Sequence, residues 1–229
     1  MNETKPVECV INGAHDLLER VERELESGLI DEQQWYAQVA AVITPAYLAG
    51  NNPRSQSGYS GDELRWTRAR GLIADALDHD GTFLDIGCAS GLLMECIQKW
   101  SADKGYTVEP FGLDLAPELA ELARQRLPHW SDRIHVGNAL TWQCERRFDF
   151  VRTGLEYVPR RRQRDLVAHL LKNVTAPGGR LIIGTYNERR ERRSLEEMVG
   201  GWGFEIAGRC ERPHRDSRVC YRVIWIDAK

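Results

Sequence analysis

The stretch from Phe83 to Gly91 joins an apolar run to a turn of small residues, with the acid Asp85 between them. Gly87 and Gly91 suit such a turn, because glycine adopts positive φ angles and lets a ligand or a helix approach the backbone. The amides that begin the next helix would face a ligand above the carboxyl end of the strand. Ala89 stands where a dinucleotide-binding turn has its middle glycine. We therefore expect a ligand that carries no diphosphate.

A second acid, Asp114, ends the next apolar run, 23 residues after Gly91. An acid at the end of a second strand can accept hydrogen bonds from both ribose hydroxyls of an adenosyl ligand. Taken alone, Asp114 would more often cap the helix that begins at Pro117 and Glu118. The combination of the small-residue turn with this acid favours the ribose-binding role.

These segments resemble the class I S-adenosylmethionine (SAM)-dependent methyltransferase family over about residues 81–226. Residues 85–91 resemble its first motif, Leu113-Asp114 its ribose-binding acid, and Gly137-Asn138-Ala139 the loop that reads the adenine. The family usually has an aspartate where this chain has Asn138, but an amide oxygen can also accept a hydrogen bond from the adenine amino group. The resemblance implies an enzyme with SAM as its cofactor.

The same resemblance implies which residues contact the cofactor. They come from the turn, the ribose acid and its neighbour, the adenine loop and the end of the fourth strand: Asp85, Gly87, Cys88, Ala89, Gly91, Asp114, Leu115, Asn138, Ala139 and Thr153. Leu115 is expected to pack on the adenine face.

The segment 148–159 resembles the fourth strand of the family and its active-site loop. SAM carries its own electrophilic methyl group, so the protein must above all align an acceptor with it, at about 3 to 3.5 Å. If a general base is used, Glu156 and Tyr157 are the candidates, because they follow the strand at the carboxyl edge. The alternatives are a solvated or helix-capping Glu156 and a Tyr157 ring that walls the pocket.

Two arginine groups, residues 160–164 and 189–193, follow the fourth and fifth strands and should emerge on the same edge. One interpretation is a rim that binds an anionic acceptor, with Arg160 as the contact, because arginine recognises carboxylates and phosphates in bidentate fashion. The other is a pair of solvated helix starts balanced by neighbouring glutamates. Tyr59, in the turn-rich segment 50–61, is a further candidate for substrate contact from a lid loop; the alternative is a plain linker.

The elements that must position these residues follow from the hydrophobic pattern. Short apolar runs alternate with helical patterns from residue 81 onward, as in parallel strands joined by crossover helices. We expect strands at 82–86, 108–113, 133–136, 148–153, 179–185, 204–209 and 219–226. We expect helices at 92–100, 117–127, 161–173 and 192–200. The last two strands are separated only by a turn at 212–217, which predicts an antiparallel hairpin.

The predicted fold is therefore an α/β Rossmann-like three-layer sandwich. Its sheet is mostly parallel and seven-stranded, with an antiparallel last strand, and a helical extension precedes it. Residues 15–49 have helical periodicity that Pro45 interrupts, and Asp62 is a candidate cap for a further helix through Leu77. We divide the chain into an N-terminal helical cap with a lid loop, residues 1–80, and a SAM-binding core, residues 81–229.

Composition excludes several functions. The formal net charge is −3 over 229 residues, so the chain lacks the positive field of a non-specific nucleic-acid binder, and a nucleic-acid partner is not expected. The start, residues 1–10, lacks a signal-peptide core, and no apolar run approaches the roughly 20 residues of a membrane span, so we expect a cytoplasmic protein without a membrane partner. Six scattered cysteines without a C-x-x-C pair indicate reduced thiols. Cys210, His214 and Cys220 are one ligand short of a zinc site, and no metal is expected.

Three functions stay open. The first is methyl transfer to a small molecule, with an anionic acceptor as its sharper form; the second is methylation of RNA or protein; the third is a SAM-binding or scaffold protein without catalysis. Neither the acceptor atom nor the oligomeric state follows from these residues, and a homodimer is one option.

Overall fold

The computed structural model describes the backbone of residues 7–189 and 194–229, and the side chains of 16–186 and 194–229. In this part of the chain, the strands form one seven-stranded sheet in the order β3-β2-β1-β4-β5-β7-β6. Their bounds are β1 Gly81–Ile86, β2 Val108–Asp114, β3 Ile134–Val136, β4 Phe148–Thr153, β5 Thr175–Arg189, β6 Gly208–Pro213 and β7 Val219–Asp227. The strands β1 to β5 pair in parallel, and β7 is antiparallel to both of its neighbours. This confirms the predicted fold class.

The sheet register brings the chemically important strand ends to one edge. Ile86 lies beside Leu113, Asp114 beside Val136, and Thr153 beside Ile183. The inner strands are buried along most of their length, as expected for a parallel sheet covered on both faces. The loops after β1, β2, β3 and β4 therefore meet at the carboxyl edge, where ligands bind in open α/β sheets.

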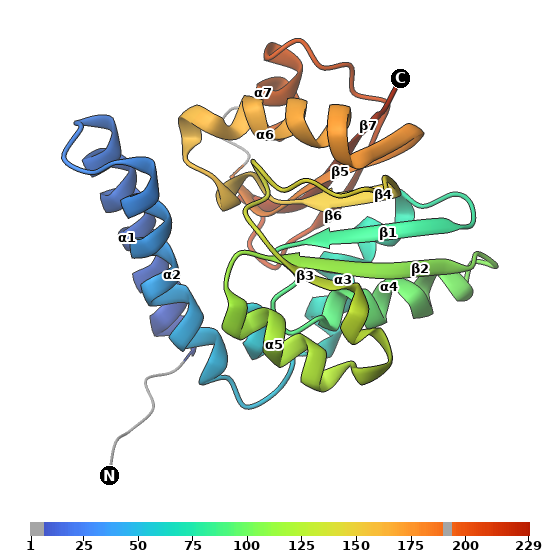
Figure 1. Cartoon of the computed structure of the whole chain (residues 1–229), viewed down its shortest axis with the longest axis horizontal. Helices are drawn as coiled ribbons and strands as arrows, with labels where there is room; N and C mark the ends of the chain where they lie inside the picture. The colour runs from blue at the N-terminus through green and yellow to red at the C-terminus, as the bar shows by residue number, and fades with distance from the viewer. Residues whose placement is uncertain (1–6, 190–193) are drawn as a thin grey trace.

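Helices cover both faces of the sheet (Figure 1). On one face lie α3 Glu63–Asp75, α4 Leu92–Ala102 and α5 Pro117–Arg126, and on the other lie α6 Gln163–His169 and α7 Leu195–Gly201. The predicted Asp62 cap is confirmed, since its side chain accepts a hydrogen bond from the Arg65 amide at 2.8 Å. The helix predicted at 161–173 is instead divided into a 3₁₀ turn, α6 and a π-helical turn, Leu170–Val174.

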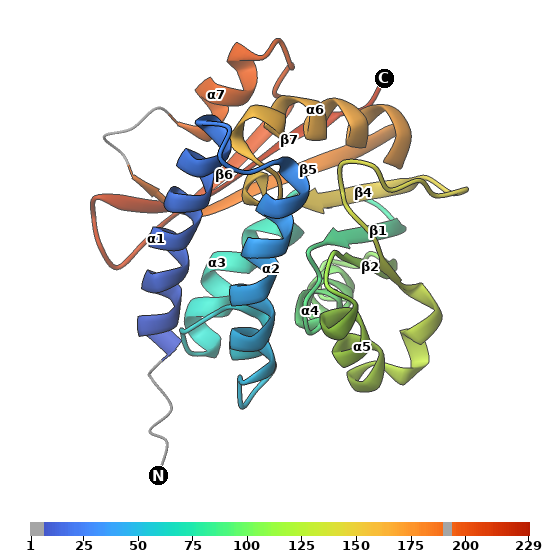
Figure 2. The same ribbon diagram turned by 60° about the vertical axis from the view of Figure 1, so that its left-hand side comes forward.

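Two further helices, α1 Val7–Glu26 and α2 Glu32–Leu48, stand across the carboxyl edge of the sheet (Figures 1 and 2). The start of α2 is fixed by a capping box between Asp31 and Gln34. Pro45 does not interrupt this helix as predicted: it lies inside α2, and the Ala49 amide still donates to the Pro45 carbonyl at 3.0 Å. Near a helix end, the hydrogen bond lost at proline removes little further pairing. Within the described residues, no helix is long and apolar enough to span a membrane.

The predicted C-terminal hairpin is confirmed, with a shifted first strand. Pairing of β6 with β7 begins at Gly208 opposite Trp225 and continues to Pro213 opposite Cys220, so β6 starts four residues later than predicted. Phe204 and Ile206 instead pack against the hydrophobic core beside α7. Burial of these apolar side chains outweighs the strand pattern at the start of the segment.

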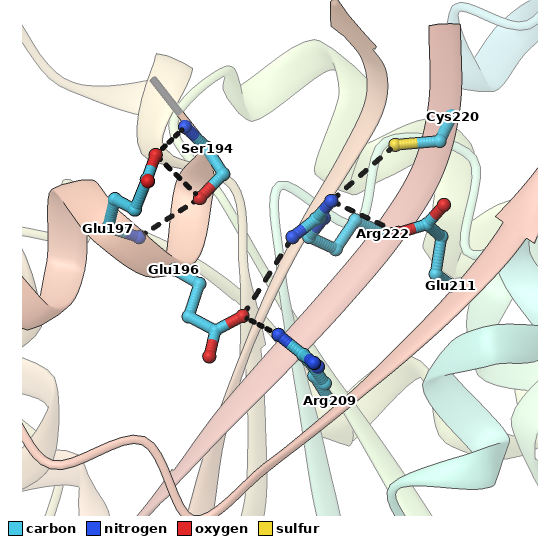
Figure 3. A network of polar contacts seen from close by, with 7 residues as sticks. All are labelled: Ser194, Glu196, Glu197, Arg209, Glu211, Cys220 and Arg222. Atoms are coloured by element: carbon cyan, nitrogen blue, oxygen red, sulfur yellow. Dashed lines mark hydrogen bonds and ion pairs between the residues drawn. The ribbon is translucent and has the colours of Figure 1, made fainter. Parts of the chain in front are cut away.

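An ionic network ties the hairpin to α7 (Figure 3). The Ser194 side chain accepts a hydrogen bond from the Glu197 amide and caps the helix. Glu196, in the first turn, binds Arg209 of β6 and lies 3.8 Å from Arg222 of β7. Arg222 also pairs with Glu211 at 3.0 Å. Partly exposed pairs of this kind contribute little singly, so we assign the network to orientation of α7.

Candidate functional site

The turn after β1 has the strained backbone that its small residues suggest. Gly87 and Gly91 have φ angles of +73° and +74°, and Ala89 has a φ of +46°, which is uncommon for a residue with a Cβ atom. The Gly87 and Cys88 amides donate to the Leu113 carbonyl at 2.7 and 3.1 Å. The turn is thereby held against β2. Strain of this kind at a ligand-facing turn persists only where the surrounding structure enforces it.

Gly91 and Cys88 have packing roles in this turn. A Cβ atom on Gly91 would lie 2.6 Å from a methyl carbon of Leu127, so the glycine permits α4 to approach the end of α5. The Cys88 thiol points into the core and packs on Gly112, where a Cβ would lie 2.8 Å from the sulfur. Burial raises the pKa of Cys88 well above its ordinary value. Any contact of Cys88 with a ligand would therefore involve its backbone.

Asp114 is a buried acid whose pKa is shifted toward neutrality at this edge. Its side chain is buried and accepts hydrogen bonds from the Ala89 amide at 2.8 Å and the Ala116 amide at 2.9 Å. Burial raises its pKa to about 6, while the amide hydrogen bonds oppose the shift. The carboxylate retains lone pairs for further donors, so a diol placed here would stabilise its charged form.

Asp85 lies beside an arginine that sequence reasoning gave no role. Asp85 and Arg152 are partners in the β1–β4 register, and the Arg152 Nη1 atom donates to the Asp85 Oδ1 atom at 3.1 Å. The same nitrogen donates to the Ile86 carbonyl at 3.2 Å and the Tyr157 hydroxyl at 2.9 Å. Burial raises the pKa of Asp85, and Arg152 opposes that shift. A charged residue inside an apolar strand pattern was the sequence signal for this pair.

The loop after β3, which is predicted to contact adenine, lies under α2. The Asn138 Oδ1 atom accepts a hydrogen bond from the Leu140 amide at 2.9 Å, which fixes the loop and leaves a second lone pair. Burial raises the pKa of Tyr36, which lies on α2. The nearby Asn138 side chain opposes that rise. Ala139 is buried and Leu115 is 39% exposed, so Leu115 offers apolar surface to a ligand.

The segment between α2 and α3 covers the turn directly. Ser90 donates to the Pro53 carbonyl at 2.9 Å, and the Ser57 hydroxyl lies 2.7 Å from the Ser90 hydroxyl. Because the Ser90 proton is used on Pro53, Ser57 is the donor in the second bond. Tyr47, at the end of α2, packs against Ala89 in a small apolar cluster at this turn.

The structure places Tyr59 in the core. Its side chain is 9% exposed, and its ring packs edge-on to Trp66 with centroids 5.3 Å apart. Segment 50–61 is thus neither the plain linker nor a free loop: it is anchored at one end by this ring and in its middle by Ser57. The substrate role of Tyr59 stays a prediction.

The two catalytic candidates differ in environment. The Tyr157 ring packs on Gly87, where an added Cβ would lie 2.6 Å from the ring, and burial raises the pKa of its hydroxyl. A phenol that stays protonated at neutral pH is a poor general base. Glu156 is exposed, and its carboxylate turns back toward Gly154. Thr153 is buried and donates to the Gly154 carbonyl at 3.0 Å.

The first arginine group contacts the N-terminal helices. Arg160 forms an ion pair with Glu19, and its amide faces the Glu22 carboxylate at 3.2 Å. Arg161 pairs with Glu32 at 3.1 Å. These contacts give the group a structural function, while the substrate contact of Arg160 remains untested. The second group, residues 189–193, lies outside the residues whose side chains are described.

Two further residues next to the site were missed by sequence reasoning. Arg70 of α3 stacks on the ring of Tyr186 of β5, with 3.4 Å from the guanidinium carbon to the ring centroid. Residue type and spacing alone gave no signal for them, because α3 and β5 are far apart in the chain. Among the described residues, no three metal-binding side chains converge, and the Cys210, His214 and Cys220 set is no exception.

Comparison with known proteins finds a domain match over part of the chain. Residues 83–179 match the profile of the methyltransferase domain. No curated protein matches the chain in sequence.

Solved structures share the fold at low sequence identity. A Burkholderia thailandensis 1,6-didemethyltoxoflavin-N1-methyltransferase, with bound 1,6-didemethyltoxoflavin and S-adenosylhomocysteine (SAH), is 18% identical, with a TM-score of 0.63, over 87% of this chain and 91% of its own. The N-methyltransferase NodS of Bradyrhizobium japonicum WM9, in complex with SAH, is 17% identical, with a TM-score of 0.52, over 82% and 97%. A SAM-dependent methyltransferase of Aquifex aeolicus is 15% identical, with a TM-score of 0.54, over 79% and 100%.

The domain match, the sheet order and the glycine turn at its carboxyl edge agree with one another. Residues 83–179 therefore match a methyltransferase domain, and the chain has the fold that solved SAM-dependent methyltransferases share.

Proposed function

We propose that the chain transfers the methyl group of SAM to a small-molecule acceptor, and that the acceptor is anionic. The cofactor supplies an electrophilic methyl on a sulfonium. The task of the protein is to bind both partners, to align them and to exclude water.

The described residues fit the cofactor. The buried Asp114 carboxylate, with a pKa raised to about 6, would accept the ribose hydroxyls, since such donors favour its charged form. Asn138, Ala139 and Leu115 would surround the adenine. The turn formed by Gly87, Cys88, Ala89 and Gly91 would offer its backbone to the rest of the cofactor, with Asp85 beneath it.

One observation carries the proposal of a compact acceptor: the N-terminal segment packs on the cofactor turn itself. The Ser57–Ser90 and Pro53–Ser90 hydrogen bonds and the packing of Tyr47 on Ala89 leave α2 and its following loop directly over the carboxyl edge. A covered edge suits an enclosed substrate better than a long polymer. The Burkholderia enzyme, which also acts on a small molecule, supports this reading.

Alignment is proposed as the main catalytic contribution. Tyr157 would form a wall, because its hydroxyl accepts from Arg152 and its pKa is raised. If proton removal is needed, exposed Glu156 is the better placed base. Arg160 and Tyr59 are retained as predicted substrate contacts, the former at the rim and the latter beneath the loop.

Two further expectations belong to the proposal. The cap is assigned to residues 1–80 and the core to 81–229, although α3 packs its buried side against the sheet. The five described cysteines are free thiols, which favours the reducing cytoplasm as the compartment.

The test is calorimetric titration of the full chain with SAM and SAH, with NAD as a decoy. Asp114→Asn is expected to weaken SAH at least tenfold, because a charged acceptor of ribose hydrogen bonds is lost. Asp132→Asn removes an exposed acid and serves as the matched control.

Methyl transfer from labelled SAM is then measured with carboxylic acids, amines, phenols, total RNA and peptides as acceptors. Turnover with a small acid confirms the proposal. Turnover with RNA or peptide alone overturns the small-molecule acceptor, and SAM binding without turnover of any class favours a non-catalytic protein. Preference for NAD would contradict the cofactor assignment.

A further inference from the structure

Helix α2 crosses the carboxyl edge of the sheet, and its last turn carries Tyr47 (Figure 2). We propose that Tyr47 is an active-site residue supplied by the N-terminal cap. Its hydroxyl lies beside the transferable methyl group and contacts the attacking atom of the acceptor. The proposal rests on the proposed function and adds to it a residue that selects an acceptor with an N–H or O–H group.

The ring of Tyr47 is held between two segments. On one side it packs against Ala89 of the turn after β1, in a cluster with Ala116 and Leu119. On the other side its hydroxyl rests on Gly58, where an added Cβ atom would overlap the phenol oxygen. Gly58 also has a φ of +69°, which glycine adopts without strain. Packing from both segments therefore sets the position of the hydroxyl.

These two segments are joined by hydrogen bonds. Ser90, in the turn after β1, donates to the Pro53 carbonyl at 2.9 Å, and its hydroxyl lies 2.7 Å from that of Ser57. Ser57 directly precedes Gly58. The turn that supports the ring of Tyr47 and the loop that supports its hydroxyl thus keep a fixed distance from each other.

The charges around the hydroxyl place it in the middle of the carboxyl edge. Burial raises the pKa of Tyr47, and Arg70 opposes that rise. Glu156 and Asp114 add to the rise, and Arg152 opposes it. Asp114 ends β2 and Glu156 follows β4, and β1 lies between these two strands in the sheet. A hydroxyl that interacts with both acids therefore lies above the end of β1.

The reacting groups should meet at the same place. With the ribose at Asp114 and the acceptor beside the loop after β4, the sulfonium of SAM would lie between them. Two other tyrosines near this edge have different environments: the Tyr157 hydroxyl accepts from Arg152, and Tyr59 lies in the core. Tyr47 is the tyrosine that the cap brings above β1.

The chemistry of a phenol suits this contact. Because its pKa is raised, the Tyr47 hydroxyl stays neutral at physiological pH. Its oxygen can accept a hydrogen bond from an N–H or O–H group and leave a lone pair of that group free to attack the methyl. The electron-rich ring is also compatible with a positive sulfonium. A carbon nucleophile offers no such donor, so we expect a nitrogen or oxygen acceptor.

The test uses sinefungin, an analogue of SAM in which a carbon that bears an amino group replaces the sulfur and its methyl. SAH carries no group at that place, so the comparison needs no known acceptor. Both compounds are titrated by calorimetry at neutral pH into the wild type and Tyr47→Phe, which keeps the ring on Ala89 and removes the hydroxyl. Tyr106→Phe is the matched control, because Tyr106 precedes β2 at the opposite edge of the sheet.

A hydrogen bond from the ammonium group of sinefungin to the phenol oxygen is charge-assisted, and its loss corresponds to about tenfold or more in affinity. Tyr47→Phe should therefore weaken sinefungin about tenfold or more and change SAH less than about twofold. Tyr106→Phe should leave both affinities at their wild-type values. This pattern would place the Tyr47 hydroxyl beside the methyl position.

Gly58→Ala tests the same placement independently, because its Cβ atom would displace the Tyr47 hydroxyl. Gly28→Ala is the control: Gly28 has a similar φ, +76°, and an added Cβ meets no atom of the described residues within 4 Å. Gly58→Ala should lower the affinity for sinefungin more than that for SAH, whereas Gly28→Ala should lower neither. Circular dichroism verifies the folding of every variant.

Two outcomes for Tyr47→Phe would overturn the proposal. Equal weakening of sinefungin and SAH would mean that Tyr47 supports the cap and does not face the methyl position. Wild-type affinity for both compounds would mean that the hydroxyl contacts neither. Both results leave the proposed function standing, whereas wild-type protein that binds neither compound refutes the proposed function and this proposal together.

Discussion

Replacing Asp114 by asparagine should make the unliganded protein less sensitive to pH. The Asp114 carboxyl is buried, and its pKa is raised to about 6 from the ordinary 3.8. The folded protein therefore holds the acid less readily in its charged form than the unfolded chain does. Below about pH 3.8 the acid is neutral in both states, and the raised pKa does not change the unfolding free energy. The loss of unfolding free energy grows as pH rises and is complete above about pH 6.

The two pKa values give the size of this effect. Their difference corresponds to about 3 kcal/mol of unfolding free energy at neutral pH, of which about 1 kcal/mol develops between pH 5 and pH 8. The Asp114→Asn variant would carry no such penalty but would lose one of the acceptors for the Ala89 and Ala116 amides. That second cost does not depend on pH, so it cancels when the variant is compared with the wild type at two pH values.

The assay is urea unfolding of the wild type, Asp114→Asn and the exposed control Asp132→Asn at pH 5, 6, 7 and 8. The stability of Asp114→Asn relative to wild type should rise by about 1 kcal/mol from pH 5 to pH 8. The Asp132→Asn control should show no such trend. Saturating SAH should reverse the difference at pH 8, because the ribose hydroxyls would stabilise the charged wild-type acid. A pH-independent difference for Asp114→Asn would refute the assigned electrostatics.

Two other predictions concern the turn and its cover. Gly87→Ala should cost about 2 to 4 kcal/mol in unfolding free energy and abolish SAH binding, because its Cβ would add overpacking against the Tyr157 ring to the strain of a φ of +73°. Gly105 has a similar φ, +87°, and open space around it, so Gly105→Ala should lower the unfolding free energy by only about 1 kcal/mol in chemical denaturation. Equal losses of unfolding free energy in the two variants would contradict the packing argument. Ser57→Ala removes the hydrogen bond to Ser90 and should speed SAH association up to about fivefold in stopped-flow fluorescence. Ser60→Ala, at an exposed serine, is the control, and the same rate in both variants would mean that the Ser57 bond does not hold the cover.

Most of the fold could be predicted from the sequence because its strands are continuous apolar runs with clear breaks. Each of the expected strands exists, and the hairpin pairs as predicted. The errors lie where tertiary contacts outweigh local preference. Pro45 lies inside α2, and β6 starts at Gly208, while Phe204 and Ile206 pack partly buried against the core.

The turn after β1 and the acid that ends β2 could also be found in the sequence, because each is local. A turn that needs positive φ angles selects small residues, and an acid that ends a strand is visible in a stretch of a few letters. Its environment is not visible: that Asp114 is buried, bound by two amides and shifted in pKa depends on Ala89, which is 25 residues away.

What the sequence determined is therefore the order of strands and helices, the small-residue turn and the acid that ends β2, since these depend on neighbours along the chain. The tertiary structure alone decided what covers the turn and which groups surround Arg70 and Arg152. Ser57 meets Ser90, and Arg70 meets Tyr186, only because α3, β1 and β5 pack together. That packing sets the partners and the pKa values of side chains from distant segments. The spacing of residues along the chain does not show which side chains will meet.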